Sequence, residues 1–151
     1  MAGGKMAGKD VGLLVLRLAL GGILMAHGIQ KLAGAGGLKA FMEQAGNIGI
    51  PKPEILAPVG VGSAVLGGLL VILGLFAQFG AAGIAGTMLF TLYYVHLKNG
   101  FWIPTEVGQA GKVPWGYEYD LALFAMALCI LLAGPGSFRL LPRKSPKPGG
   151  P

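Results

Sequence analysis

The chain has 151 residues, of which 54% are hydrophobic and 12% are charged, and its formal net charge is +6. Ordinary soluble proteins carry roughly 25% charged residues, so the composition is typical of a membrane protein, and the length fits one domain. The 12 Lys and Arg residues are scattered along the chain, which favours membrane lipids with anionic headgroups, rather than nucleic acid, as the partner.

Four apolar segments have about the 20-residue length that crosses the hydrocarbon of a bilayer. They are residues 11–33, 55–76, 79–97 and 117–133. The second and third are separated by a tight turn at Gln78, whereas the connections at 34–54 and 98–116 are long and contain prolines. We therefore predict an all-α, integral membrane four-helix bundle in up-down-up-down order, with two long loops on one side.

The predicted transmembrane domain covers residues 11–140 and follows an N-terminal tail, residues 1–10. The tail at 141–151 is basic and rich in Pro and Gly, and we expect it to be disordered or bound to a partner. The first segment could instead be a secretory signal peptide, because Lys5 and Lys9 precede it and small residues follow it. Arg17 favours a spanning helix, since a charge is rare inside the short apolar core of a signal peptide.

Orientation follows from where the positive charges lie outside the membrane. Six Lys and Arg residues fall on the side of the two tails and the short turn, and five fall on the side of the long loops. The cluster from Arg139 to Lys147 is free of acidic residues, whereas the long loops also carry glutamates. We therefore expect both termini to be cytoplasmic, in a bacterial or archaeal cytoplasmic membrane, with the long loops extracytoplasmic.

Several polar residues gather toward the predicted extracytoplasmic ends of the helices. His27 lies about 9 Å inside the end of the first helix and shares a face with Gln30 and Lys31. Polar residues at such a depth need a partner on another helix or on a ligand. We take as the candidate site a group of residues near the same surface: His27, Lys31, Tyr93, His96, Trp115 and Glu118.

Each of these residues also has a structural interpretation. Lys31 can extend to the membrane surface, and Trp115 can belong to an aromatic belt at the headgroups. Glu118 and Asp120 can be solvated acids that complement a helix dipole. Arg17, the intramembrane charge, is more simply a structural anchor than a catalyst. The partner of His27 stays open between Glu118, His96 and a ligand.

Six motifs, in order along the chain, resemble the DoxX family of small four-helix membrane proteins. They are RLALGGILMAHGIQKL at 17–32, GIPKP at 49–53, GGLLVILGL at 67–75, VHLKNGFW at 95–102, GYEYDLAL at 116–123 and AGPGSFRL at 133–140. The residues that match the family are Arg17, His27, Gly28, Lys31, His96, Asn99, Gly100, Gly116, Tyr117 and Glu118. Many relatives carry an acid early in the second helix, and Ala64 stands at the nearest position here.

The resemblance implies a membrane subunit of an oxidoreductase or electron-transfer complex, since relatives include small subunits of thiosulfate:quinone oxidoreductase. Such a subunit could contribute to a quinone site near the extracytoplasmic surface, with His27, His96 and Glu118 supplying hydrogen bonds and protons. The sequence has no flavin or dinucleotide fingerprint, metal motif or dithiol, and its one cysteine is Cys129. We therefore expect no intrinsic cofactor or metal and no catalysis by the chain alone.

Two alternatives remain at the level of the sequence. The chain could be a non-catalytic accessory or structural subunit of a larger membrane complex, which the missing acid near Ala64 favours. It could also hold a b-type haem between His27 and His96, although the family resemblance offers no haem and two histidines are a weak signal.

Overall fold

The computed structural model describes residues 3–102 and 116–140, and the regular structure in these two ranges is helical throughout. Three helical segments within them are long and apolar enough to cross a membrane, namely Gly8–Ala33, Pro53–Leu73 and Ala77–Asn99. Together with the composition, these segments establish an all-α membrane protein.

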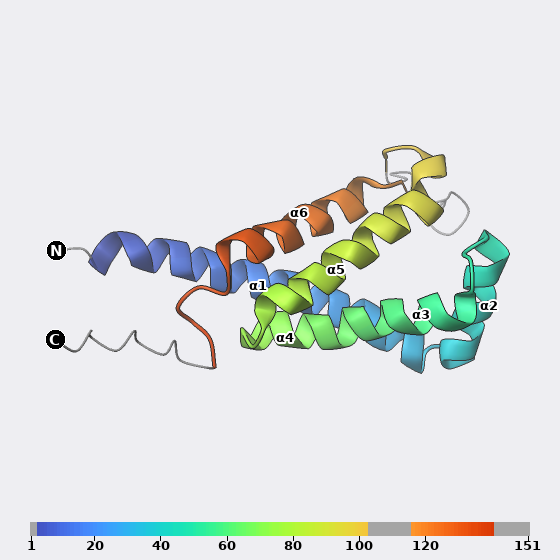
Figure 1. Ribbon diagram of the computed structural model, residues 1–151, viewed down its shortest axis with the longest axis horizontal. Helices are drawn as coiled ribbons and strands as arrows, with labels where there is room; N and C mark the ends of the chain where they lie inside the picture. Colours follow the sequence, from blue (N-terminus) through green and yellow to red (C-terminus); the bar gives the residue numbers. More distant parts are fainter. Residues whose placement is uncertain (1–2, 103–115, 141–151) are drawn as a thin grey trace, which may run out of the picture.

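The first long helix, α1 (Gly3–Ala33), is followed by a second, short helix, α2 (Gly37–Ile48). The segment 34–54 was predicted only as a long loop, so α2 corrects that prediction. Twelve residues are too few to cross a bilayer, and a search for spanning segments therefore passes over such a helix. Gly36, with φ of 80°, precedes α2 and Gly49, with φ of 93°, follows it, which lets the chain turn sharply at both ends. Figure 1 shows α2 across the end of the long helices.

The second apolar segment is one helical stretch with a widened turn inside it. It consists of α3 (Pro53–Gly62), the π-helix η1 (Ser63–Gly67) and α4 (Gly68–Leu73). It ends at Leu73 rather than at the predicted residue 76, because Gly74 adopts φ of 70° and its N–H closes the last turn on Val71 O.

The third segment begins with α5 (Ala77–Thr91), continues as the π-helix η2 (Leu92–His96) and ends in the 3₁₀ turn η3 (Leu97–Asn99). The last described helix, α6 (Glu118–Ala133), has 16 residues, which places it below the length of the three spanning candidates. It packs along α5 (Figure 1).

Small residues bring the long helices together. The Cβ of an alanine at Gly21 in α1 would lie 2.6 Å from Gly68 O, and one at Gly80 in α5 would lie 2.8 Å from Gly67 O. These contacts let the backbones approach closely, as is usual where hydrocarbon surrounds the helices. The core between them is formed by fully buried residues of four helices: Leu20, Val71, Ala81, Ile84, Ala127 and Ile130.

Arg17 lies inside the protein, with 1% of its surface exposed, and its guanidinium joins three parts of the chain. Nε donates to Val71 O at 2.7 Å and Nη2 to Ile72 O at 2.7 Å, both at the C-terminal end of α4. Nη1 donates to Pro135 O at 2.7 Å and to Phe138 O, beyond α6. Among the described residues, no carboxylate contacts this cation. The carbonyls at the helix C-terminus carry partial negative charge and stabilise it instead.

Candidate functional site

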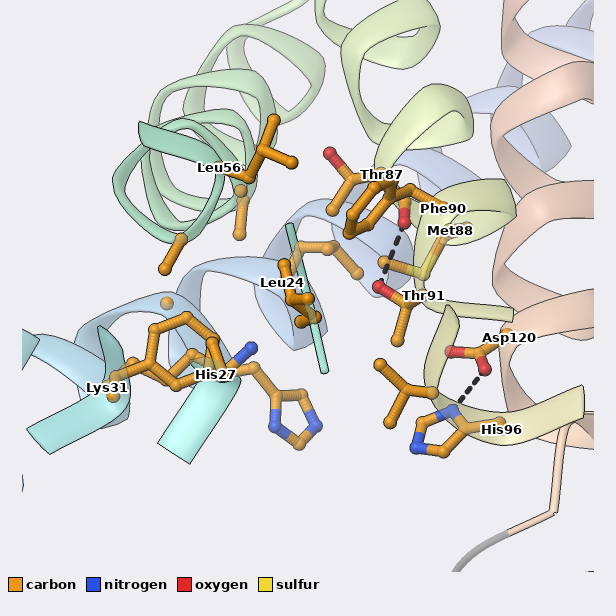
Figure 2. Close-up of a pocket in the computed structure, with 18 of the residues that line it drawn as sticks. Leu24, His27, Lys31, Leu56, Thr87, Met88, Phe90, Thr91, His96 and Asp120 are labelled. Carbon is orange, nitrogen blue, oxygen red and sulfur yellow. Dashed lines mark hydrogen bonds and ion pairs between the residues drawn. The ribbon is translucent and has the colours of Figure 1, made fainter. Parts of the chain in front are cut away.

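A cavity of about 320 Å³ lies between the C-terminal half of α1, α2, α3, α5 and the first turn of α6. Figure 2 shows the side chains around it. Its deep wall is apolar and belongs to the core, with Leu24, Ala64, Met88 and Leu123. Its polar side is formed by His27, Lys31, Gln44, Thr87, Thr91, His96, Tyr119 and Asp120.

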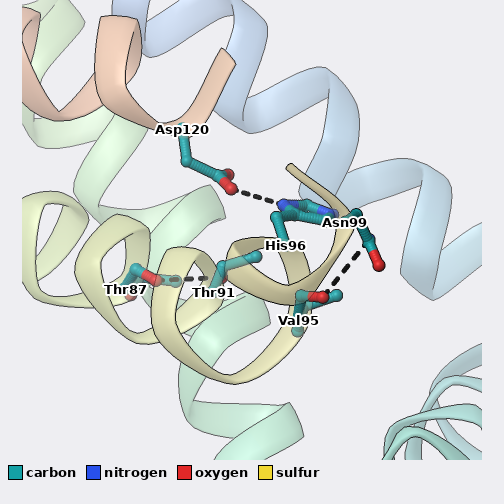
Figure 3. Close-up of polar contacts among 6 residues, drawn as sticks. All are labelled: Thr87, Thr91, Val95, His96, Asn99 and Asp120. Carbon is teal, nitrogen blue, oxygen red and sulfur yellow. Dashed lines mark hydrogen bonds and ion pairs between the residues drawn. The ribbon is translucent and has the colours of Figure 1, made fainter. Parts of the chain in front are cut away.

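Among the polar lining residues, His96 and Asp120 form a direct pair between two helices. His96, in the π-helix η2, bonds through Nδ1 to Oδ2 of Asp120 in the first turn of α6 (Figure 3). The side chain of His96 is 24% exposed and that of Asp120 is 5% exposed, so the carboxylate is the buried partner. A carboxylate accepts the hydrogen of Nδ1, which leaves Nε2 as an acceptor on the neutral ring and as a second donor on the charged ring.

The two threonines near this pair bond within their own helix. Thr91 Oγ1 donates to Thr87 O at 2.9 Å, and Thr87 Oγ1 donates to Gly83 O at 3.0 Å. Such bonds to the preceding turn satisfy the hydroxyl hydrogens without a second helix. The two oxygens therefore contribute acceptor capacity to the cavity rather than donors.

His27 is the residue whose partner the sequence left open between Glu118, His96 and a ligand. Its Nε2 lies 3.3 Å from Tyr119 Oη, and the two rings meet edge to face with centroids 6.1 Å apart. The contact joins α1 to α6 at the edge of the cavity. A separation of 3.3 Å is long for a hydrogen bond to a hydroxyl, so this link is weaker than the pair at Asp120.

Lys31 follows His27 by one helical turn and lines the same cavity. Its Nζ lies 4.3 Å from the centre of the Phe41 ring in α2, a distance suited to attraction between an ammonium group and an aromatic face. The contact holds α2 beside the end of α1 and keeps one positive charge at the rim of the cavity.

The cavity brings together some of the predicted site residues and excludes others. His27, Lys31 and His96 line it. Tyr93 is 67% exposed, on the outside of η2, and Glu118 is half-buried at the start of α6, neither of them among the described lining residues. Trp115 lies outside the described residues.

Sequence reasoning missed Asp120, Tyr119 and Phe41 as site residues. The sequence left Asp120 open to interpretation as a solvated acid at a helix start, but it is 4% exposed. A signal for its burial was present, since Asp120 precedes Leu123 by three residues and Ala127 by seven, on the face that α6 buries. Phe41 lies in α2, which was not predicted as a helix.

In the described parts of the chain, no three His, Cys, Asp or Glu side chains lie close enough to hold a metal ion. Cys129 is exposed on α6 and distant in sequence from the lining residues of that helix, Tyr119 to Leu123. The imidazoles, carboxylate, ammonium and phenol that line the cavity are groups capable of hydrogen bonding and proton exchange.

The fold and cavity define an all-α membrane protein with a polar site between its helices. A family model, DoxX, matches residues 12–97. The chain is also 30% identical over 125 residues to a protein of Bacillus subtilis (strain 168) described as "Putative oxidoreductase CatD", which covers 83% of this chain and 81% of that protein. The chain belongs to the DoxX family, which confirms the resemblance seen in its motifs and makes it an integral membrane protein. No solved structure matches it.

Proposed function

We propose that the protein is a membrane subunit of an oxidoreductase system and that its cavity binds the headgroup of a quinone. Membership of the DoxX family and the similarity to a protein described as an oxidoreductase support the general class. The observation that supports the quinone is the His96–Asp120 pair in a cavity whose remaining wall is largely apolar.

The cavity fits the chemistry of a quinone headgroup in size and polarity. Ligand pockets for small molecules begin at about 300 Å³ and combine an apolar lining with a few polar groups that fix orientation. A quinone is a planar apolar ring with two carbonyl acceptors, and when bound it takes up two electrons and two protons. His27, Lys31 and His96 can donate N–H groups to such acceptors, and Leu24 and Met88 offer an apolar surface.

The residues of the chain would act on protons rather than on electrons. His96 can hold a proton at Nε2 while Asp120 fixes the ring through Nδ1 and stabilises the charged imidazole. The ammonium of Lys31 adds a donor at the rim, and the buried apolar wall excludes water. Because the sequence carries no electron-transfer motif, the electrons must come from a redox group on a partner subunit.

We further propose that α1, the α3–α4 stretch, α5 and α6 all cross the membrane in up-down-up-down order, with both termini cytoplasmic. The contact between Asp10 and Ser137 supports an even number of crossings, because it joins the start and end of the described chain. Figure 1 shows those ends at one end of the molecule and α2 at the other. The exposed apolar side chains of α6, such as Leu121 and Leu132, support a lipid-facing position.

Binding of a headgroup without a tail tests the proposed function directly. The full-length protein in lipid nanodiscs is titrated with 2,3-dimethoxy-5-methyl-1,4-benzoquinone, and bound quinone is measured by equilibrium dialysis. We expect saturable binding, weakened about tenfold in His96→Ala through loss of a hydrogen bond. Tyr93→Ala is the matched control outside the cavity and should bind as the wild type does.

Equal binding by wild type and His96→Ala would place the quinone elsewhere, and absence of saturable binding would refute the quinone assignment. Gentle solubilisation from the native membrane distinguishes a quinone-binding subunit from a purely accessory one. A chain that migrates with a large complex but binds no quinone is an accessory subunit. A chain that migrates with that complex and binds quinone at His96 contributes to its redox site.

A further inference from the structure

A second, shallow groove lies on the outer side of the His27–Tyr119 contact. It is lined by Ile23, Ala26, His27 and Gln30 of α1 and by Tyr119 of α6. His27 and Tyr119 line both this groove and the cavity, so their two side chains form the wall between them. Separation of these two rings would therefore join the groove to the cavity.

The groove lies on an exposed face of α1. Ala26 is exposed, and Ile29, on the same side of α1, is 48% exposed. Ile23 and Ala26 give the floor an apolar character, while Gln30 and His27 form its polar end. In a protein surrounded by lipid, such a surface is in contact with acyl chains.

Few contacts hold the wall between groove and cavity together. It depends on one hydrogen bond of 3.3 Å and one edge-to-face ring contact, and neither ring is buried, since His27 is exposed and Tyr119 is half-buried. A weak contact between rotatable side chains separates on the nanosecond-to-microsecond scale without movement of a helix. By contrast, the pair at His96 and Asp120 is buried on its acidic side.

From this continuity we propose that the α1–α6 groove is a lateral portal, and that the ligand of the cavity is a lipid-soluble quinone with a long apolar tail. The inference rests on the proposed function and names its substrate class. The headgroup passes between His27 and Tyr119 into the cavity, and the tail stays in the groove over Ile23 and Ala26. Such a ligand reaches the site without leaving the bilayer.

The tail does not gain affinity merely by leaving water, because it is already in hydrocarbon before it binds. What the groove provides is space, so that the headgroup can lie in the cavity while the tail remains outside. Filling the groove should therefore exclude tailed quinones by steric conflict and leave a tail-free headgroup unaffected.

The experiment compares two quinones that share one headgroup. Full-length protein in nanodiscs is titrated with 2,3-dimethoxy-5-methyl-1,4-benzoquinone and with the same ring carrying a decyl chain. In Ala26→Trp, which fills the groove, we expect binding of the decyl compound to weaken about tenfold or more and that of the bare ring to change less than about twofold. Ala26→Leu should give a smaller loss in the same direction.

Ala82→Trp is the matched control, because Ala82 is an exposed alanine on α5 away from both hollows. It should bind both quinones as the wild type does. Unchanged binding of the decyl compound by folded Ala26→Trp would overturn the portal while leaving the headgroup site intact. Failure of the bare ring to bind the wild type would refute the proposed function itself, and with it the portal.

Discussion

His96 and Asp120 form a hydrogen bond between η2 and α6, with the carboxylate almost completely enclosed by the protein. The two residues are 24 positions apart, on either side of the segment 103–115. The pair connects the two helices beside the cavity. Variants of His96 and Asp120 can therefore be used to measure both the stability of the protein and its affinity for a ligand.

The two single substitutions of this pair should differ in stability. His96→Ala leaves a buried carboxylate without its imidazole partner, and we expect a loss of about 3 kcal/mol in the free energy of unfolding. Asp120→Asn keeps an oxygen acceptor for Nδ1–H and leaves no buried charge, so its loss should be about 1 kcal/mol. Unfolding in mixed detergent and SDS, followed by circular dichroism, measures both.

The double variant provides the control for this prediction. Once Asp120 is Asn, removal of the imidazole should destabilise much less than it does in the wild type. Equal effects of His96→Ala in both backgrounds would show that the two side chains do not interact energetically.

Hydrophobic length predicted the helices well but not the site. The three spanning segments are recognisable because each is a predominantly apolar helix of 21 to 26 residues, which is long enough to cross a bilayer. Membership of the family could be predicted as well, because the motifs from Arg17 to Leu140 are local strings. The arrangement of four crossings stays a prediction.

The polar contacts depend on which helix faces which, and a single sequence does not show this. His27 was recognised as needing a partner, but Tyr119 is set by the packing of α1 against the first turn of α6. The sequence left it open whether Asp120 is a solvated acid, because acids at helix starts are commonly exposed. The π-helix that contains His96 has no sequence signature, although it widens the turn that precedes the contact with Asp120.

Arg17 provides a second prediction, which concerns the stability of the end of the protein opposite to the cavity. Its guanidinium donates to carbonyls at the end of α4 and beyond α6, among them Ile72 and Pro135. In Arg17→Lys, one ammonium group replaces the planar guanidinium and cannot donate to all of these carbonyls. Some buried carbonyl oxygens therefore lose their hydrogen-bond donors. We expect a loss of about 2–4 kcal/mol in unfolding free energy by SDS titration.

Leu18→Ala is the neighbouring control, since Leu18 is 48% exposed on the outer face of α1 and should change stability by less than about 0.5 kcal/mol. If the two variants unfolded at the same SDS fraction, the carbonyl contacts of Arg17 would have no net effect on stability.

Adjacent glycines in α1 give a third prediction with a built-in control. A Cβ at Gly21 would lie 2.5 Å from Ile72 Cγ1 and 2.6 Å from the backbone oxygen of Gly68, whereas a Cβ at Gly22 meets nothing within 4 Å. Gly21→Ala should therefore separate α1 from α4 and destabilise the protein by about 2 kcal/mol. Gly22→Ala should leave stability unchanged or raise it by up to about 1 kcal/mol, because alanine favours the helix.

Thermal unfolding in detergent, read as the fraction that remains monodisperse after heating, ranks the two variants. A higher transition temperature for Gly21→Ala than for Gly22→Ala would contradict the close packing of α1 on α4.

Ser63 supports a prediction of the opposite sign, an increase in stability. Its hydroxyl is buried at the start of η1 and has no hydrogen-bond partner within the described ranges of the chain. A polar atom that loses its water without gaining a partner costs about 1–3 kcal/mol, so Ser63→Ala should stabilise the protein by about 1 kcal/mol. Thr87→Val is the comparison, because the hydroxyl of Thr87 already bonds to Gly83 O and its removal should give no gain. SDS titration of both variants measures the difference in unfolding free energy. Destabilisation by Ser63→Ala would contradict this prediction, because it would show that the hydroxyl forms a hydrogen bond at the widened turn of the folded protein.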